Sequence, residues 1–350
     1  MKNNFYKMLS IATATVIVAM TSVSSFAETK TDVVDGDRQD ISLELNKSVF
    51  KKADEVILVN ENATVDSISA TSLAYARKAP ILLSSKRNLG RATRSYIESL
   101  GAKKVTIIGG SDVISKETEN NLIRMGIEVD RMMGQTRYDT SLNIARTFYR
   151  DYGFDKAFLV SSSVGIENAM SVYAYAAKNN IPLIWCKKEN TDDVLEYLKG
   201  KDLSNVYLVG ERNDFPDNVE KNNKNVEVID KINKARSNIA TLRKFYKPED
   251  FNKIYMTKVN YGSANTAQEF ISLGVVAAYN NMPILISDED MSYEQKKFLQ
   301  TEHVNTVVQV GGKIQPYSTL NLLTSRTVMS SIILTFILIG VVYRCMRYGI

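Results

Sequence analysis

Three arginines recur at equal spacing and have the chemistry to contact an anion. Arg38, Arg137 and Arg236 are separated by 99 residues each time. A guanidinium group can fork onto two phosphate oxygens, so each arginine is a candidate phosphate contact. The alternative is a structural ion pair within or between repeated units, and the commonness of such pairs favours that alternative. A polar residue two positions after each arginine is a candidate helix cap: Asp40, Asp139 and Asn238.

Residue types needed for enzyme chemistry are scarce. The chain has one histidine, His303, and two cysteines in unlike surroundings, Cys186 and Cys345. This excludes zinc sites built from several histidines and leaves no CxxC pair. No GxSxG surrounds the serines at 161–163, and neither a P-loop nor a GxGxxG motif is present. We therefore predict a protein that is not an enzyme and uses no metal or cofactor. The net charge of +5 is too small and too dispersed to favour nucleic acid as a partner.

The elements that position the arginines form a threefold repeat. "APILLSS" at 79–85 returns as "IPLIWCK" at 181–187 and as "MPILISD" at 282–288. Three glycines recur at nearly the same interval as these prolines: Gly109, Gly210 and Gly311 are each 101 residues apart. Such agreement predicts three copies of one unit of about 100 residues. We assign the copies to residues 33–132, 133–231 and 232–323.

Each copy has the same predicted order of helices and strands. A helix follows the arginine, then come a β-rich run, a helix that ends near the proline, and a short apolar strand. A further helix leads to a last strand that runs into the glycine turn, as in "VTIIGG". Strands that alternate with helices indicate an α/β unit with a mainly parallel sheet. The continuously apolar run after each proline is typical of a strand covered on both faces.

Polar residues follow each apolar strand, where α/β folds bind anions at the carboxyl ends of strands. We predict direct ligand contacts here, from the following residues: Ser84, Ser85 and Lys86 in the first copy, Lys187 and Lys188 in the second, and Ser287 in the third. The third copy continues with Asp288, Glu289 and Asp290, and these acids predict weaker anion binding there.

The two ends of the chain carry targeting patterns. Residues 1–27 have a positive start, an apolar run and small residues before a cut site, so we predict a secretory signal peptide; the alternative is an uncleaved anchor. Residues 327–343 are predicted to be a transmembrane helix, with 344–350 as a basic cytoplasmic tail; the alternative is a buried terminal helix. Together these patterns predict an exported protein at the cell surface, anchored in the membrane by its C-terminal segment.

Three motifs together resemble a known family. They are "GQTRYDTS" (134–141), "DSISATSLAYARKAPILL" (66–83) and "VTIIGGSDVIS" (105–115). The chain resembles the type 2 cell-wall-binding repeat (CWB2) of surface-layer and cell-wall proteins of clostridia and other Gram-positive bacteria. The resemblance implies three Toprim- or Rossmann-like units around a pseudo-threefold axis, in a monomer with an internal pseudo-trimer.

The resemblance also implies a function and a set of residues. It implies non-covalent attachment to an anionic cell-wall polymer, with the proline-led strands involved. Its candidate binding positions are Pro80, Ile81, Leu82 and Leu83; Pro182, Leu183, Ile184 and Trp185; and Pro283, Ile284, Leu285 and Ile286. Copies two and three depart from the family motifs, as in "PLIW" and "NKARSNIA", which predicts that one or more sites are weak or lost. Two alternatives stay open: an envelope enzyme acting on wall polymers, and a structural module that has lost its ligand.

Overall fold

The computed structural model describes residues 29–162, 166–187, 191–216, 218–223, 225–229, 234–258, 271–288, 290–312 and 314. The predicted signal peptide (1–27), transmembrane helix (327–343) and tail (344–350) lie outside these residues. Within the described ranges, no helix is both long enough and apolar enough to cross a bilayer.

The first sheet is built from the first copy of the repeat. Its parallel strands lie in the order β3-β2-β4-β5. The strands are β2 (Glu55–Asn60), β3 (Ile81–Ser84), β4 (Lys104–Ile108) and β5 (Glu128–Met132). The helices are α2 (Arg38–Val49), α3 (Thr64–Ala76), α4 (Arg91–Leu100) and α5 (Lys116–Arg124). Gly101 ends α4 in the left-handed conformation, which favours glycine.

The second sheet repeats this order as β7-β6-β8-β9, again all parallel. The strands are β6 (Lys156–Ser161), β7 (Leu183–Cys186), β8 (Asn205–Val209) and β9 (Val226–Ile229). The helices are α6 (Arg137–Tyr152), α7 (Ile166–Met170), α8 (Tyr173–Lys178), α9 (Thr191–Leu198), α10 (Val219–Asn222) and the 3-10 turn η1 (Arg212–Asp214).

The third sheet takes one strand from the other end of the chain. Its order is β1-β12-β10-β11, and β1 (Lys30–Val34) pairs in parallel with β12 (Thr306–Val310). The other strands are β10 (Lys253–Lys258) and β11 (Ile284–Ser287), and the helices are η2 (Pro248–Asn252), α11 (Lys234–Phe245), α12 (Leu273–Asn280) and α13 (Tyr293–Thr301). Thus β1 holds the edge position that β5 and β9 hold in their sheets. The repeat boundaries predicted from the sequence leave all of this strand outside the third copy.

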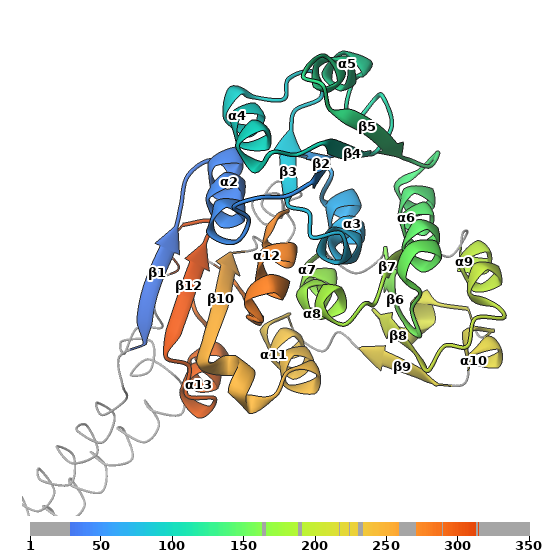
Figure 1. Ribbon diagram of the computed structural model, residues 1–350. Helices are drawn as coiled ribbons and strands as arrows, with labels where there is room; N and C mark the ends of the chain where they lie inside the picture. The colour runs from blue at the N-terminus through green and yellow to red at the C-terminus, as the bar shows by residue number, and fades with distance from the viewer. Residues whose placement is uncertain are drawn as a thin grey trace, which may run out of the picture.

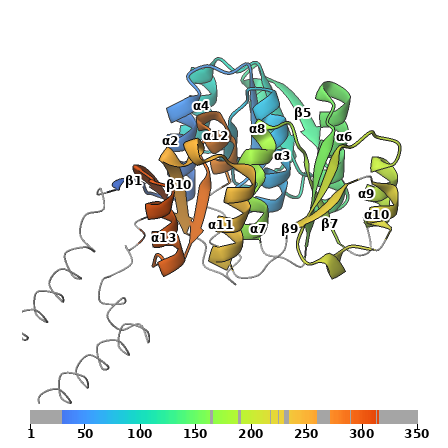
Figure 2. The same ribbon diagram turned by 90° about the horizontal axis from the view of Figure 1, so that it is seen from below.

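Three equivalent helices close the repeats into a ring. α3, α8 and α12 pack against one another between the three sheets (Figures 1 and 2). The approach is close, since a Cβ atom on Gly274 of α12 would lie 2.5 Å from the ring of Tyr173. The hydroxyl of Ser72 donates to the carbonyl of Ile181 at 2.6 Å, and that of Ser272 donates to Ile81 at 2.8 Å. The predicted α/β fold with three repeats is confirmed as three parallel four-stranded sheets.

Candidate functional site

The three proline-led strands lie in the core. Every residue of β3, β7 and β11 is buried, and Pro80, Pro182 and Pro283 precede them in buried positions. The carbonyl of each proline accepts a hydrogen bond from the neighbouring strand at 2.9–3.0 Å. The aliphatic side chains are therefore not accessible to a polymer, so any part they have in binding is to position the loops that follow.

Each of these strands lies at the edge of its sheet. Buried polar side chains form hydrogen bonds with backbone groups on the edge that has no neighbouring strand. Asn46 of α2 donates to the carbonyl of Ile81 at 2.9 Å. Ser141 of α6 accepts from the backbone N–H of Trp185 at 2.8 Å. Asn238 of α11, which the sequence suggested as a helix cap, instead accepts from the N–H of Ile286 at 3.0 Å and donates to Ile284. These residues lie eight, four and two positions after their arginines, so the repeat gave no signal for Asn46 and Ser141.

The polar residues after the strands differ in accessibility. Ser84 is buried, and its hydroxyl donates to the carbonyl of Asn88 at 3.2 Å within the loop. Ser287 is also buried, with its hydroxyl 3.3 Å from Gln295 Oε1. Lys86 is exposed, whereas Lys187 is half-buried with its ammonium 5.3 Å from the ring of Tyr138. Lys86 and Lys187 are thus accessible cations of these loops, and exposed Arg87 follows Lys86. Ser85 is half-buried, and Lys188 lies outside the described residues.

The repeated arginines occupy three different settings. Arg236 forms an ion pair with Glu294 at 2.8 Å, and this hydrogen bond lowers the pKa of the Glu294 carboxyl. Arg38 donates to Asn62 Oδ1 at 3.1 Å, beside the carboxyl end of β2. Arg137 lies near Asp66, a residue of the preceding repeat, and acts on it electrostatically. The structural ion pair considered for the arginines is thus present at Arg236.

Asp66 is a buried acid at a characteristic place in the first sheet. Successive strands lie on opposite sides of β2, so the crevice between the carboxyl ends of β2 and β4 is the switch point where α/β sheets bind ligands. Asp66 lies in the first turn of α3, directly after β2, and is 7% exposed. Its Oδ1 atom has no hydrogen-bond partner. Burial raises the pKa of the Asp66 carboxyl to about 6, and the charge of Arg137 partly opposes this rise.

Gly109 forms the other wall of this crevice. It follows β4 with a φ of 103°, a conformation that favours glycine. A Cβ atom here would lie 3.4 Å from Asp66 Oδ2 and 3.1 Å from Val113, so a side chain would crowd the acid. Gly109 is therefore needed for this close approach of the backbone. Arg131 donates to the Gly109 carbonyl at 2.7 Å and fixes the turn.

The second repeat carries a similar feature. Asn168 is in phase with Asp66, and its buried Nδ2 atom has no hydrogen-bond partner among the described residues. Gly210 is in phase with Gly109 and has a φ of 142°, but Glu211 stands where the first and third copies have a second glycine. In the third copy, Glu269 is the in-phase acid, and it lies outside the described residues.

Metal ligands, the cysteine Cys186 and the histidine His303 are the candidates for enzyme chemistry among the described residues. No group of three potential metal ligands is found among them. Cys186 is buried, and burial raises the pKa of its thiol to about 12, which keeps it protonated at neutral pH. His303 is exposed and occupies a turn after α13 with a φ of 53°.

Comparison with known proteins identifies the family. The sequence profile of cell wall binding domain 2 (CWB2) matches residues 35–119 and 131–220, half of the chain. The chain belongs to the CWB2 family. The matched ranges fall in the first two repeats, and the third sheet, with the same strand order, adds the third.

Two curated bacterial proteins and two solved structures are similar to this CWB2 chain. The N-acetylmuramoyl-L-alanine amidase LytC of Bacillus subtilis is 28% identical over 174 residues, 49% of this chain and 34% of LytC. The amidase enhancer of the same organism is 30% identical over 188 residues, 53% of this chain and 25% of the enhancer. The chain thus matches about a third or less of the length of these relatives.

The solved structures agree with the fold. Cwp8 from Clostridium difficile is 30% identical with a TM-score of 0.72, and the match covers 87% of this chain and 53% of Cwp8. Cwp6 from the same organism has a TM-score of 0.73 at 23% identity, covering 82% of this chain and 46% of Cwp6. The likeness to Cwp6 shows the fold alone. Membership of the CWB2 family supports a cell-wall-binding module at the cell envelope.

Proposed function

We propose that this CWB2 chain attaches non-covalently to an anionic cell-wall polymer and does not catalyse a reaction. One observation carries the proposal: at the switch point of a parallel sheet, the charge of Arg137 of one repeat acts on the buried carboxyl of Asp66 of the preceding repeat, whose Oδ1 atom has no hydrogen-bond partner. A polar ligand in this crevice would satisfy that atom, because a buried polar atom without a partner costs about 1–3 kcal/mol.

The chemistry of this crevice suits a phosphate or a similar group. The guanidinium of Arg137 would pair with the anion, and Asp66 in its protonated form would donate a hydrogen bond to it. The exposed Lys86 and the half-buried Lys187 would add charge along the loops. In this proposal the units are Toprim- or Rossmann-like and lie around a pseudo-threefold axis. The buried strands led by Pro80, Pro182 and Pro283 hold the loops in place.

The third repeat is proposed to bind more weakly than the first. Arg236 is already engaged by Glu294, and the exposed Asp288 follows the buried Ser287. Acids at the same rim repel an anionic polymer. The sites of the ring would therefore differ in strength.

Retention on purified wall polymer tests the proposal. The full chain is expected to bind at low salt and to be released as salt rises, because screening weakens exposed charge interactions. An absence of salt-sensitive retention would overturn polymer binding. Turnover of isolated wall material by the pure chain would instead support the alternative of an envelope enzyme.

We also propose export by residues 1–27 and membrane anchoring by residues 327–343. The support is the apolar composition of both segments and the basic residues beside them. The test is fractionation of the full chain against a chain truncated after Ser325, with a carbonate wash. Release of both chains by carbonate would refute the anchor.

A further inference from the structure

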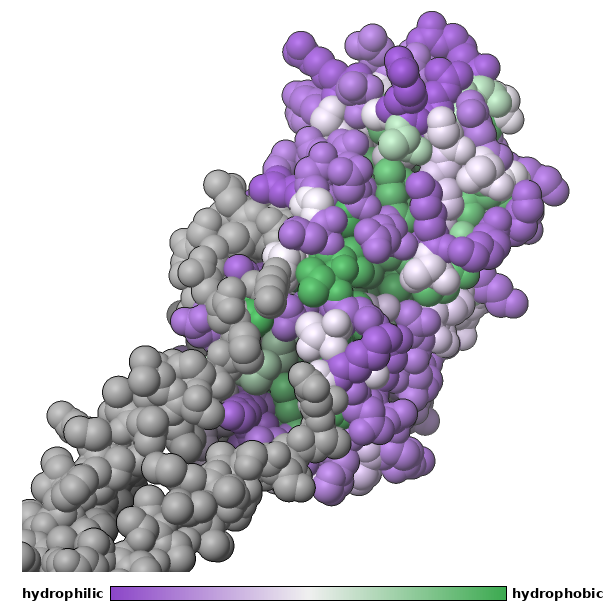
Figure 3. All heavy atoms as spheres, turned by 90° about the vertical axis from the view of Figure 1, so that its left-hand side faces the viewer, coloured by the Kyte–Doolittle hydropathy of each residue, from purple (hydrophilic) through white to green (hydrophobic). Residues whose placement is uncertain are grey.

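The ring contains three equivalent junctions, and a cleft lies at one of them. A junction is here the contact between one sheet and the first helix of the next repeat: the first sheet with α6, the second with α11, and the third with α2. A cleft of about 630 Å³ lies at the third junction. Figure 3 views the molecule from this side, where hydrophobic surface is visible between hydrophilic regions.

An ion-pair network fills the first junction. Arg77, three residues before Pro80, pairs with Glu55 of β2 at 2.8 Å and with Asp151 of α6 at 3.1 Å. Its side chain is 12% exposed. A large cationic side chain therefore occupies the space between this sheet and the next helix.

An aromatic cluster fills the second junction. The ring of Phe158 on β6 stacks on Tyr207 of β8 at 4.8 Å. Phe245 of α11 meets the edge of both rings, at 5.5 and 5.3 Å, and Tyr175 completes the group. Bulky rings thus occupy the space that Arg77 occupies in the first junction.

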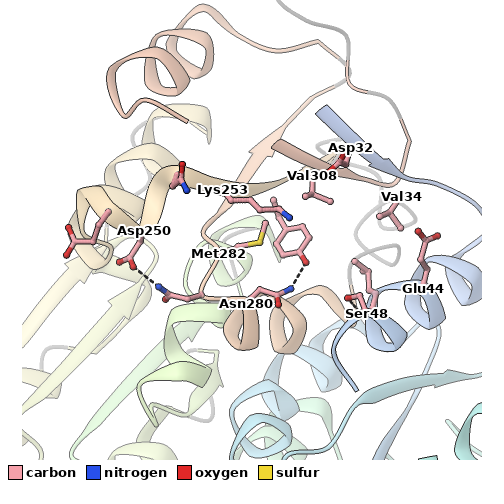
Figure 4. Close-up of a pocket in the computed structure, with 14 residues that line it drawn as sticks. Asp32, Val34, Glu44, Ser48, Asp250, Lys253, Asn280, Met282 and Val308 are labelled. Atoms are coloured by element: carbon pink, nitrogen blue, oxygen red, sulfur yellow. Dashed lines mark hydrogen bonds between the residues drawn. The ribbon is translucent and has the colours of Figure 1, made fainter. Parts of the chain in front are cut away.

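Smaller residues leave the third junction open. Asn280 holds the position of Arg77, since each lies three residues before its proline. Val308 holds the position of Tyr207, since each lies three residues before its glycine. Neither side chain is long enough to fill the space, and the cleft results. Figure 4 shows Glu44 and Ser48 of α2 on one side of it and Asp32, Val34 and Val308 on the sheet.

The lining of the cleft offers more acceptors than donors. Its charged residues are four acids and one lysine: Asp32, Glu44, Glu249, Asp250 and Lys253. Asp32 pairs with Lys30 at 3.2 Å, and Asp250 accepts from Asn281 at 2.6 Å. Glu44 and Glu249 have no ion-pair partner among the described residues. A ligand that fits this lining must bring hydrogen-bond donors and positive charge.

The remaining lining suits the apolar face of a sugar ring. The Nδ2 atom of Asn280 donates to the Tyr255 hydroxyl at 2.8 Å, which fixes the amide and leaves its oxygen as an acceptor. Val34, Leu45, Met282 and Val308 give the floor apolar surface. A few fixed polar groups above an apolar floor are typical of small-molecule sites.

We propose that the third junction is a binding site for a sugar that carries a free amino group. The hydroxyls would donate to the carboxylates and to the Asn280 oxygen, and the ammonium group would pair with Glu44. Lys253 begins β10 and Met282 precedes β11, so the site lies toward the amino ends of these strands, apart from the proposed polymer crevices. This site and the polymer crevices require opposite charge, so the two proposals fail separately.

Calorimetric titration of the full chain with glucosamine, N-acetylglucosamine and glucose tests the site. Glucosamine is expected to bind about tenfold more tightly than the other two, because they lack the positive charge. Glu44→Gln keeps the shape of the side chain and is expected to remove this preference. Equal affinities for the three sugars in the wild-type chain, or no binding at all, would overturn the proposal.

A second variant tests the position of the site. Asn280→Arg places in the third junction the residue that fills the first, and it is expected to weaken glucosamine binding at least tenfold. The matched control is Asn179→Arg, the same change at the equivalent position of the second repeat, which should leave binding unchanged. Melting temperatures confirm that both variants fold. Polymer retention by Asn280→Arg is expected to be normal; unchanged glucosamine binding, or a parallel loss of polymer retention, contradicts a separate sugar site here.

Discussion

The guanidinium of Arg77 lies 3.1 Å from the carboxylate of Asp151 and thereby joins the first repeat to the second. Arg77 follows α3 of the first repeat, while Asp151 lies near the end of α6, the first helix of the second. The same guanidinium pairs with Glu55 of the first sheet. One side chain therefore connects a sheet, its helix and the neighbouring unit.

Arg77→Ala is expected to destabilise the ring. The change leaves Glu55, which is 15% exposed, without its cation, and an unpaired carboxylate in that position is costly. We expect a loss of about 2–3 kcal/mol in the free energy of unfolding, below the range for fully buried pairs because Asp151 is partly exposed. Urea unfolding measures the loss. Arg150→Ala is the matched control, since exposed Arg150 also pairs with Asp151; it should change stability little, and an equal loss in both variants would refute a special role for Arg77.

Asp66→Asn is expected to stabilise the protein at neutral pH. Burial raises the pKa of Asp66 from 3.8 to about 6, so between these values the folded state binds more protons than the unfolded state. Stability from this group is therefore full below pH 4 and falls as pH rises toward 6. The difference corresponds to up to about 3 kcal/mol at pH 7.5, which the asparagine would recover. Urea unfolding from pH 3.5 to 7.5 should show a gain that vanishes at the acidic end.

Asn168→Asp is the reciprocal change in the second repeat. It places a carboxyl at the position equivalent to Asp66, where the buried Nδ2 atom of the asparagine itself has no hydrogen-bond partner. We expect lower stability at pH 7.5 and recovery as the pH falls. A stability difference that is constant with pH, in either this variant or Asp66→Asn, would contradict a buried acid at these positions.

The sequence predicted the units of this fold better than their connections. The regular spacing of Pro80, Pro182 and Pro283 identified three buried strands. A continuous apolar run can be recognised in the sequence without knowing which strands it pairs with. The closure by β1 was not predicted, because "KTDVV" has no fully buried residue and its partner strand lies at the far end of the chain. Neither Asn46 nor Ser141 could be recognised, because each satisfies a strand edge from a different position of its helix. The third junction is open because the side chains of Asn280 and Val308 are both small. These residues belong to different sequence motifs, so neither motif alone predicts the cleft.

Charge reversal after the strands is expected to weaken polymer retention. Lys86→Glu and Lys187→Glu each place a negative charge at the proposed binding loops, where it repels an anionic polymer. We expect retention at low salt to fall about fivefold for each variant, corresponding to roughly 1 kcal/mol. Lys103→Glu is the matched control, since Lys103 is exposed at the amino end of β4, away from these loops. Retention unaffected by both loop variants would favour a structural module that has lost its ligand.

Asp32→Pro is expected to open the ring at the third sheet. The N–H of Lys30 donates to Asn305 and the carbonyl of Val34 accepts from Gly311, so even-numbered residues of β1 direct their backbone toward β12. Proline at 32 removes a ladder donor and leaves its acceptor on β12 without a partner, which should cost about 1–3 kcal/mol. Val33→Pro is the matched control, because the N–H of Val33 points away from β12 on this edge strand. Amide hydrogen exchange should show faster exchange in β12 for Asp32→Pro alone; equal protection in both variants would mean that β1 does not hold the ring closed.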